Sequence, residues 1–236
     1  VQYYTGQVID MAEVCRLGHE AGSKVGLDLA HAIGNVPLLL HDWGPDFAAW
    51  CTYKYLNGGP GSVAGAFVHE RHLHGDGTNQ LTGWWGHDMA TRFKMEHQFE
   101  PAAGAERWQL SNPPILALAP VVASLDVFAE AGIDNLVAKS KLQSAYMRYL
   151  LGELFAGQVE TITPVGDCGC QLSLVITDSN LNARGVFKAL EQLHVIGDWR
   201  EPNVIRVAPV PLYNSFDDIH EMFARLRAAI EANEQE

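Results

Sequence analysis

Residues 24–28 (KVGLD), 46–51 (DFAAWC) and 62–68 (SVAGAFV) are short apolar runs with little polar alternation, and they decide the expected fold. Runs of this kind are typical of strands that lie between two layers of helix. The stretch 8–21 before them has the spacing of an amphipathic helix, and Gly22 is a natural helix stop. We therefore expect an α/β fold whose sheet is covered on both faces.

After residue 68 the periodicity of the sequence first weakens and then becomes helical. The stretch 69–101 is rich in His, Gly and Trp and has weak periodicity, so we expect irregular structure there. Beyond it, the spacing predicts helices at 115–131, 134–155, 182–193 and from Ser215, and strands at 170–176 and 204–208. The Leu and Ala stripes of the first two helices are expected to be core. Residues 1–135 should belong to a large domain, and residues 136–236 should form a small α+β domain.

The charge balance excludes some classes of partner. The chain has 236 residues with 16 Lys and Arg against 28 Asp and Glu, so its formal charge is −12. A nucleic acid or an anionic membrane surface needs clustered positive charge, so neither is expected as the main partner. We also find no apolar run near the roughly 18 residues that a membrane span needs. The chain starts at Val1 without the basic leader of a signal peptide.

The cysteines and histidines do not form a recognisable metal site. Four cysteines are too few for a disulfide scaffold, which favours a reducing, cytoplasmic compartment. Cys168 and Cys170 form C-x-C rather than the C-x-x-C of zinc sites, and we expect them to begin a buried strand. The five histidines between residues 41 and 87 follow no standard ligand spacing, so no metal is expected; these are His41, His69, His72, His74 and His87.

Asp28 and Lys54 carry the chemistry that the pattern suggests. Asp28 ends the first predicted strand, where open α/β sheets place ligand contacts, and His31 follows three residues later. Lys54 follows the second strand and precedes a glycine-rich loop. A lysine that forms a Schiff base and a carboxylate that keeps a ring nitrogen protonated together suit pyridoxal phosphate (PLP). Each feature alone is more often structural: an Asp-x-x-His is usually a cap or a core hydrogen bond, and a lysine after a strand is usually solvated.

Several stretches, in order along nearly the whole chain, resemble the kynureninase family. They are 28–36 (DLAHAIGNV), 40–43 (LHDW), 46–57 (DFAAWCTYKYLN), 83–87 (GWWGH), 92–95 (RFKM), 111–115 (SNPPI) and 205–216 (IRVAPVPLYNSF). The resemblance implies the carboxyl-terminal part of a fold-type-I PLP-enzyme large domain, followed by a small α+β domain. It also implies hydrolytic Cβ–Cγ cleavage of kynurenine, or of its 3-hydroxy form, to an anthranilate and alanine, in tryptophan catabolism and NAD biosynthesis.

The same resemblance assigns roles to individual residues. It implies that Lys54 binds the cofactor aldehyde and moves protons, and that Asp28 pairs with the ring nitrogen. Arg206 would grip the α-carboxylate of the substrate. The other assigned residues lie at the cofactor, the last two reaching the phosphate region of a neighbouring subunit in a homodimer; they are His31, Tyr53, Trp84 and Asn112. Lys54 and Tyr53 are therefore the expected catalytic residues.

The position of Asp28 also implies that part of the site is missing. In the resembling family this acid comes near the middle of the chain, so we expect the present sequence to be the carboxyl-terminal half. The other half would carry the phosphate-binding loop and an aromatic residue stacked on the cofactor ring. Two alternatives stay open: another PLP enzyme of this fold, such as a cysteine desulfurase using Cys168 or Cys170, and an inactive fragment that only dimerises. The choice between kynurenine and 3-hydroxykynurenine is also open.

Overall fold

The structure of the chain, a computed structural model, describes residues 1–73 and 80–234. Internal contacts divide it into two units. Unit 1 comprises Val1–Ile9, Gly34–Pro37 and Phe128–Glu236, and unit 2 comprises Asp10–Ile33 and Leu38–Val127. The expected α/β class is confirmed, whereas a domain boundary at residue 135 stays a prediction.

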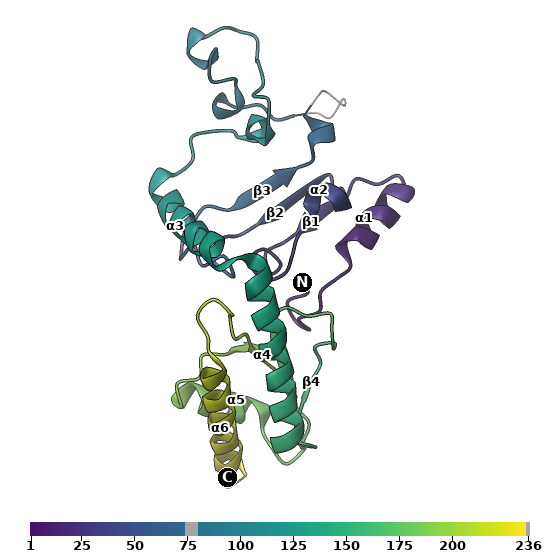
Figure 1. Ribbon diagram of the computed structural model, residues 1–236, viewed down its shortest axis with the longest axis vertical. Helices are drawn as coiled ribbons and strands as arrows, with labels where there is room; N and C mark the ends of the chain where they lie inside the picture. The colour runs from purple at the N-terminus through teal and green to yellow at the C-terminus, as the bar shows by residue number, and fades with distance from the viewer. Residues whose placement is uncertain (74–79, 235–236) are drawn as a thin grey trace. The chain divides into compact units, whose positions relative to one another are not determined.

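Unit 2 is built on a three-stranded sheet in the order β1-β2-β3 (Figure 1). Its regular elements are α1 (Met11–Glu20), β1 (Gly26–Asp28), α2 (Leu40–Trp43), β2 (Phe47–Trp50) and β3 (Gly65–Val68). Strands β1 and β2 are parallel, and Asp28 is paired with Ala49; β3 runs antiparallel to β2. All three strands fall within the predicted apolar runs.

The expectation of a sheet covered on both faces is wrong for this chain. Within the three strands only Ala48 is buried, and Phe47 keeps 53% of its surface exposed. The helix α3 (Ile115–Ala131) has its predicted bounds and continues through Pro120. Its apolar stripe is not core, because Val121 is the only buried residue within it. A sequence pattern shows which apolar residues favour burial, but it does not show whether the protein that buries them belongs to the same chain.

The segment between β3 and α3 is irregular, as expected. Its described part forms short 3-10 turns, namely η1 (Glu70–His72), η2 (Trp84–Gly86), η3 (Arg92–Lys94) and η4 (Ala105–Trp108). Gly86 is required where two of these turns meet, since a Cβ there would come within 2.3 Å of the carbonyl oxygen of Arg107. His74 lies outside the described residues.

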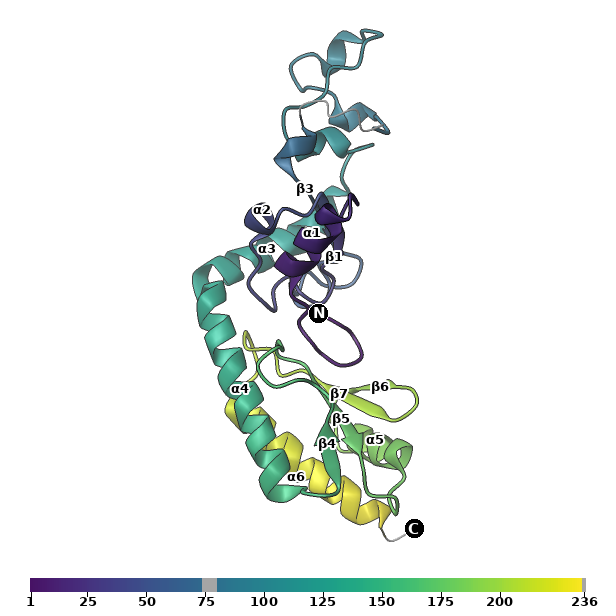
Figure 2. The same ribbon diagram turned by 90° about the vertical axis from the view of Figure 1, so that its right-hand side faces the viewer.

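Unit 1 is a four-stranded antiparallel sheet with three helices, and its strand order is β4-β5-β7-β6 (Figure 2). The elements are α4 (Ile133–Leu154), β4 (Val159–Thr161), β5 (Leu172–Ile176), α5 (Ala183–Gln192), β6 (Asp198–Arg200), β7 (Val204–Val207) and α6 (Phe216–Asn233). Helices α4 and α6 run side by side along this sheet. The core lies between helices and sheet, and includes Met147, Leu172, Val186, Ile205 and Phe223.

The two faces of the unit 1 sheet have different neighbours. Leu172 and Leu174 of β5 point into the core, so Ser173 between them faces the other way. On that face lie residues 1–9: the Ser173 hydroxyl donates to the carbonyl of Tyr4, and Gln7 forms a β-bridge with Cys168. The first residues of the chain thus belong to the small sheet rather than to the sheet that follows them in sequence.

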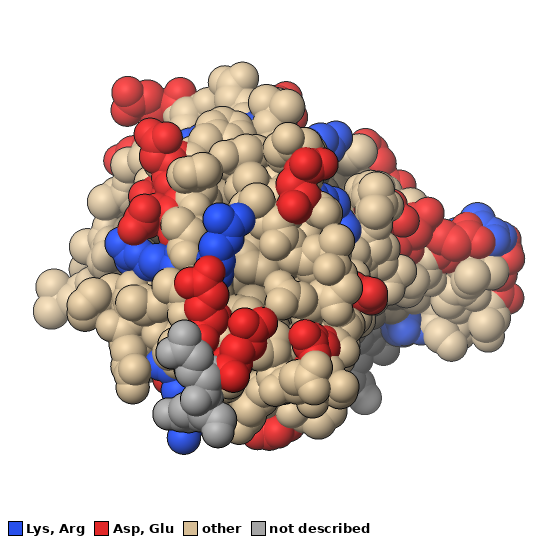
Figure 3. Space-filling view, turned by 90° about the horizontal axis from the view of Figure 1, so that it is seen from below, with Lys and Arg blue, Asp and Glu red and all other residues tan. Residues whose placement is uncertain are grey.

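No single described helix is long and apolar enough to span a membrane, although α3 and α4 satisfy the same test together as a bent pair. On the face drawn in Figure 3, acidic side chains are scattered among basic ones, and outside the grey residues we see no continuous basic patch.

Candidate active site

The parallel pairing of β1 and β2 brings the Asp28 segment beside the segment that leads to Lys54. The carboxyl ends of parallel strands meet at one edge of a sheet. Leu29 N donates to the carbonyl of Ala49 at 2.9 Å, which continues the pairing one residue past β1. The Cys51 sulfur lies 4.0 Å from the carbonyl oxygen of Ala30. Both chain segments therefore leave the sheet side by side.

Asp28 is the last residue of β1, and His31 lies in the turn that follows it. The Asp28 carboxylate is exposed, and its Oδ1 accepts a hydrogen bond from Ala30 N at 2.9 Å. The His31 ring meets the Tyr55 ring edge-on, with 5.8 Å between centroids. This contact joins the turn after β1 to the loop that holds Lys54.

The loop around Lys54 is closed at its base. Gly58 N donates to the carbonyl of Thr52 at 2.8 Å, and Asn57 N donates to the carbonyl of Lys54 at 3.0 Å. Thr52 is buried, and its hydroxyl is 2.6 Å from Ser62 Oγ. Lys54 itself is half-buried on this fixed turn. The geometry holds an amine in place while leaving it accessible.

The opposite side of the same loop is anchored to α3. Leu56 is buried, and its carbonyl accepts a hydrogen bond from the Ser124 hydroxyl. This hydrogen bond fastens the loop to the apolar helix α3, although its two residues are 68 positions apart in sequence.

Tyr53 is exposed and lies next to the amine, with Lys54 Nζ 5.9 Å from its ring centroid. A hydrogen bond with Cys51 raises the pKa of the Tyr53 phenol above its ordinary value. A phenol with a raised pKa keeps its proton at neutral pH, so Tyr53 can act as a hydrogen-bond donor there.

Asp46, immediately before β2, is the centre of a buried network that the sequence pattern did not reveal. Its carboxylate accepts from Val25 N at 2.6 Å and lies 3.0 Å from His19 Nε2 and 2.7 Å from His72 Nε2. Burial alone would raise the pKa of Asp46, but these hydrogen bonds and the charge of Lys24 outweigh burial and hold that pKa well below its usual range. No local spacing reveals the network, because both histidines are more than 25 residues away.

Trp84 lies in η2 and is partly exposed. Its ring meets Phe93 edge-on at 5.6 Å between centroids. Beside it, the buried Arg92 stacks over Trp85 at 4.3 Å and donates to the carbonyls of Trp85 and His87. A hollow of about 400 Å³ is lined by Trp84, His87 and Arg92 among others. Arg92 thus fixes the turn that presents Trp84.

Asn112 is exposed in the coil before α3. Its predicted role at the phosphate region of a neighbouring subunit stays a prediction, as does that of Trp84.

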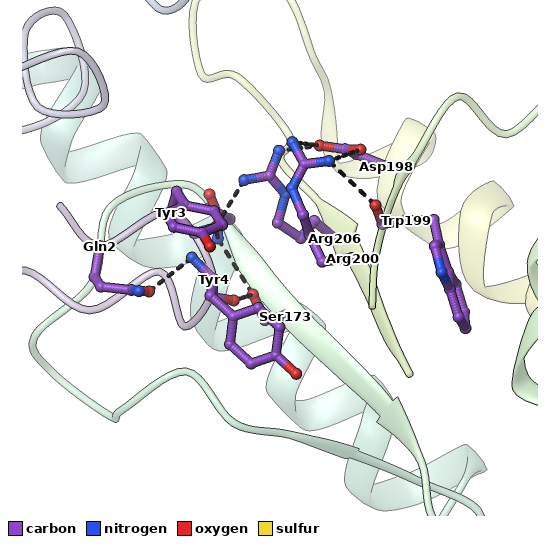
Figure 4. A network of polar contacts seen from close by, with 9 residues as sticks. Gln2, Tyr3, Tyr4, Ser173, Asp198, Trp199, Arg200 and Arg206 are labelled. Carbon is purple, nitrogen blue, oxygen red and sulfur yellow. Dashed lines mark hydrogen bonds and ion pairs between the residues drawn. The ribbon is translucent and has the colours of Figure 1, made fainter. Parts of the chain in front are cut away.

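Arg206 lies in unit 1, in a network drawn in Figure 4. In the antiparallel register it stands opposite Asp198 of β6 and Ser173 of β5. Its Nη1 donates to the carbonyl of Tyr3 at 2.7 Å, and its Nη2 donates to the Asp198 carboxylate. The Arg206 side chain is only 12% exposed. Arg200 also pairs with Asp198, at 2.7 Å.

The structure thus gathers four of the predicted residues, Asp28, His31, Tyr53 and Lys54, around one edge of the unit 2 sheet. Arg206 is held in unit 1. Within residues 1–73 and 80–234, we find no group of three or more His, Cys, Asp or Glu side chains placed to hold a metal ion.

Comparison with known proteins identifies what the chain resembles. A family profile described as the kynureninase C-terminal domain matches residues 136–226. The kynureninase of Xanthomonas oryzae pv. oryzae is 51% identical over 230 residues, which cover 97% of this chain and 54% of that protein. The kynureninase of Xanthomonas campestris pv. campestris is 51% identical over 224 residues, covering 94% and 53%. The chain therefore spans about half the length of the curated relatives that it matches.

Solved structures confirm the fold. A C-DES mutant with glycine covalently linked to its PLP cofactor aligns with a TM-score of 0.79 and 22% identity, over 95% of this chain and 57% of the other. The cysteine desulfurase CsdA from Escherichia coli aligns with a TM-score of 0.76 and 16% identity, over 97% and 57%. At these identities the likeness concerns the fold alone.

Proposed function

We propose, from the premise that this chain is similar nearly throughout to the carboxyl-terminal portion of kynureninases, that it supplies that portion of a PLP-dependent kynurenine hydrolase. The observation that carries the proposal is the meeting of the Asp28 turn and the Lys54 loop at one edge of a parallel strand pair. That pair is the minimal set that PLP needs: an amine for its aldehyde and an acid for its ring nitrogen.

The residues present suit the cofactor. Lys54 is accessible on a turn fixed by Thr52, and the Asp28 carboxylate is exposed at the same edge. Bound PLP supplies an electron sink for the bonds that break at the substrate α-carbon. Asp28 would keep the ring nitrogen protonated, and the Lys54 amine would take and return the α-proton.

Other side chains would orient the reactants. Tyr53 would donate a hydrogen bond toward the cofactor phosphate, and His31 would lie beside the cofactor. Arg206 would bind the substrate α-carboxylate through two parallel hydrogen bonds, a geometry suited to guanidinium. In the proposed homodimer, Trp84 and Asn112 of one subunit would complete the phosphate site of the other. The proposed substrate is kynurenine or its 3-hydroxy form, and the products are an anthranilate and alanine.

A cysteine desulfurase is less well supported, although such enzymes are among the structural neighbours. That reaction needs a mobile nucleophilic cysteine. Cys170 is buried, and Cys168 is half-buried at a β-bridge with Gln7. Identity is also 51% to kynureninases against 16% to the desulfurase CsdA.

A chimera tests the proposal, because the chain covers about half of its relatives. This chain would replace the matched region of the Xanthomonas oryzae kynureninase, and release of anthranilate from kynurenine would be followed by fluorescence. We expect activity in the chimera and a loss of at least about 10²-fold in Lys54→Arg, because arginine cannot act as the amine or the general base.

The matched control is Lys188→Arg on α5, an exposed lysine in unit 1 that should tolerate the change. A folded chimera that binds PLP but releases sulfide from cysteine, and no anthranilate from kynurenine, would support the desulfurase instead. A folded chimera that binds no PLP would support the inactive fragment.

A further inference from the structure

The guanidinium of Arg206 is already occupied by a carboxylate of its own chain, and this carries an inference that rests on the proposed role of Arg206. Asp198 Oδ2 accepts from Arg206 Nη2, and it also lies 2.7 Å from Arg200 Nη2. The other carboxylate oxygen, Oδ1, accepts from Arg200 Nη1 at 2.9 Å. Asp198 is therefore held by both oxygens to Arg200 and by only one to Arg206 (Figure 4).

One hydrogen-bond donor of the Arg206 guanidinium has no acceptor in the part of the chain that the structure describes. Its Nε is buried and has no hydrogen-bond partner among the described residues. Nε and Nη2 form one edge of the guanidinium, and a carboxylate normally engages both N–H groups of such an edge. Asp198 uses one of the two. A second carboxylate could therefore bind the edge more completely than Asp198 does.

The net charge of the network also favours binding of an anion. Two guanidinium groups share one carboxylate, so the three side chains carry a net charge of +1. The third contact of Arg206 is the neutral carbonyl of Tyr3. Asp198 is 39% exposed, so it can turn away without leaving a buried charge unpaired.

We propose that Asp198 is an internal competitor for Arg206, which a substrate carboxylate displaces, and that Arg200 is the partner that retains Asp198 after displacement. Asp198 and Arg200 are then positioning residues that set the affinity of the site for α-carboxylates. The cross-strand register fixes this arrangement, since Asp198 of the edge strand β6 stands directly opposite Arg206 of β7.

The test is a titration of the 236-residue chain with L-alanine, observed at the Nε–H resonance of Arg206 by NMR and assigned with Arg206→Lys. L-Alaninamide, which lacks the carboxylate, is the ligand control. Asp198→Asn removes the competitor, so the Kd for L-alanine should fall about two- to fivefold, the scale of a half-exposed ion pair. Arg200→Gln leaves Asp198 with Arg206 as its remaining arginine partner, so the Kd should rise by a similar factor.

The double variant separates this exchange from a general charge effect. If Asp198 acts only by competing, Asp198→Asn with Arg200→Gln should bind L-alanine as tightly as Asp198→Asn alone. A general charge effect would return the Kd to the wild-type value, since one charge of each sign is lost, and that result would overturn the proposal. Glu221→Gln, which breaks the Glu221–Arg225 pair on α6, is the matched control and should change nothing.

The possible failures are distinguishable. If the Arg206 resonance responds to L-alanine but Asp198→Asn weakens binding, the competitor role is wrong while the carboxylate role of Arg206 stands. If no variant responds, both roles are wrong. Asp198→Ala provides a second variant should the asparagine variant fail to fold.

Discussion

At the scale of single residues, Asp46 is the centre of a buried polar network in unit 2. It joins the start of β2 to the backbone before β1 and to His19 and His72. Asp46→Asn should lower the free energy of unfolding at pH 7 by about 2–4 kcal/mol, because a buried hydrogen-bonded charge and its partners are disrupted. Urea denaturation measures this. Asp42→Asn, an exposed carboxylate of the same unit, is the control and should change little.

The depressed pKa of Asp46 also fixes the direction of a pH effect. Its folded pKa is lower than the value of about 3.9 expected in the unfolded chain. The stabilisation is therefore fully present above about pH 4, and it is lost as the pH falls below that value toward the folded pKa. Between pH 5 and pH 3, Asp46→Asn should lose less stability than the wild type does. An equal loss in both proteins would show that another group causes the acid sensitivity.

Removal of the Asp28 carboxylate should affect turnover but not covalent attachment of PLP, whereas removal of the Lys54 amine should affect both. In the chimera, Asp28→Ala should still attach PLP covalently, because Lys54 is present, but turnover should be almost abolished since the ring nitrogen loses the carboxylate that keeps it protonated. Cofactor absorbance and anthranilate release, measured on one sample, test this. Asp42→Asn is again the matched carboxylate control. Full activity in Asp28→Ala would remove the acid from the proposed site.

Residue patterns predicted part of the site and missed the rest for a physical reason. The adjacency of Asp28 and Lys54 follows from two successive parallel strands, which sequence can reveal. The partners of Asp46 and the pairing of Asp198 with Arg206 arise from tertiary contacts and strand register. The alternation Asp198-x-Arg200, shortly before Arg206 in the sequence, was the local signal available for that pairing.

At the scale of elements, the predictable features were those with strong local signals. The bounds of α3 match the prediction, and Ser215 caps α6 with a reciprocal hydrogen-bond pair to Asp218. Strands β4 and β6 have only three residues each, too few to show a period, and they were not predicted. The exposure of α3 was not predictable from its sequence. An apolar helix has the same sequence pattern whether the residues that bury it belong to its own chain or to another.

The turn that presents Trp84 depends on close packing at Gly86. In Gly86→Ala, the new Cβ would lie 2.3 Å from the carbonyl oxygen of Arg107, so the two turns must separate. We expect a loss of about 1–3 kcal/mol in the free energy of unfolding, as for other overpacked sites. Gly152→Ala on α4 is the matched control: its Cβ meets no atom within 4 Å, and alanine should stabilise the helix by up to about 1 kcal/mol. Equal effects in both variants would contradict this packing argument.

At the scale of the whole molecule, we expect a homodimer whose active sites are shared. The apolar surface of α3, including Ile115 and Leu116, is exposed in this chain and suits burial by further protein. In the chimera, Lys54→Ala and Asn112→Ala should each be inactive or strongly impaired. Mixed and allowed to exchange subunits, they should regain activity, because one site of the mixed dimer would contain both native residues.

The control for this experiment is a mixture of two single variants, Lys54→Ala and Asp28→Ala. Both residues lie at the same sheet edge of one subunit. Their mixed dimer should regain activity only if Asp28 and Lys54 act in different subunits, which the parallel pairing of β1 and β2 argues against. Recovery in this control, or none in the first mixture, would contradict the proposed sharing.

The most direct test of the central claim asks which lysine binds the cofactor. The PLP-loaded chimera would be reduced with borohydride, digested and mapped by mass spectrometry. We expect a stable label on Lys54 within this chain and no label in Lys54→Arg. A label instead on Lys24, Lys94, Lys139, Lys141 or Lys188 would contradict the assignment of the site.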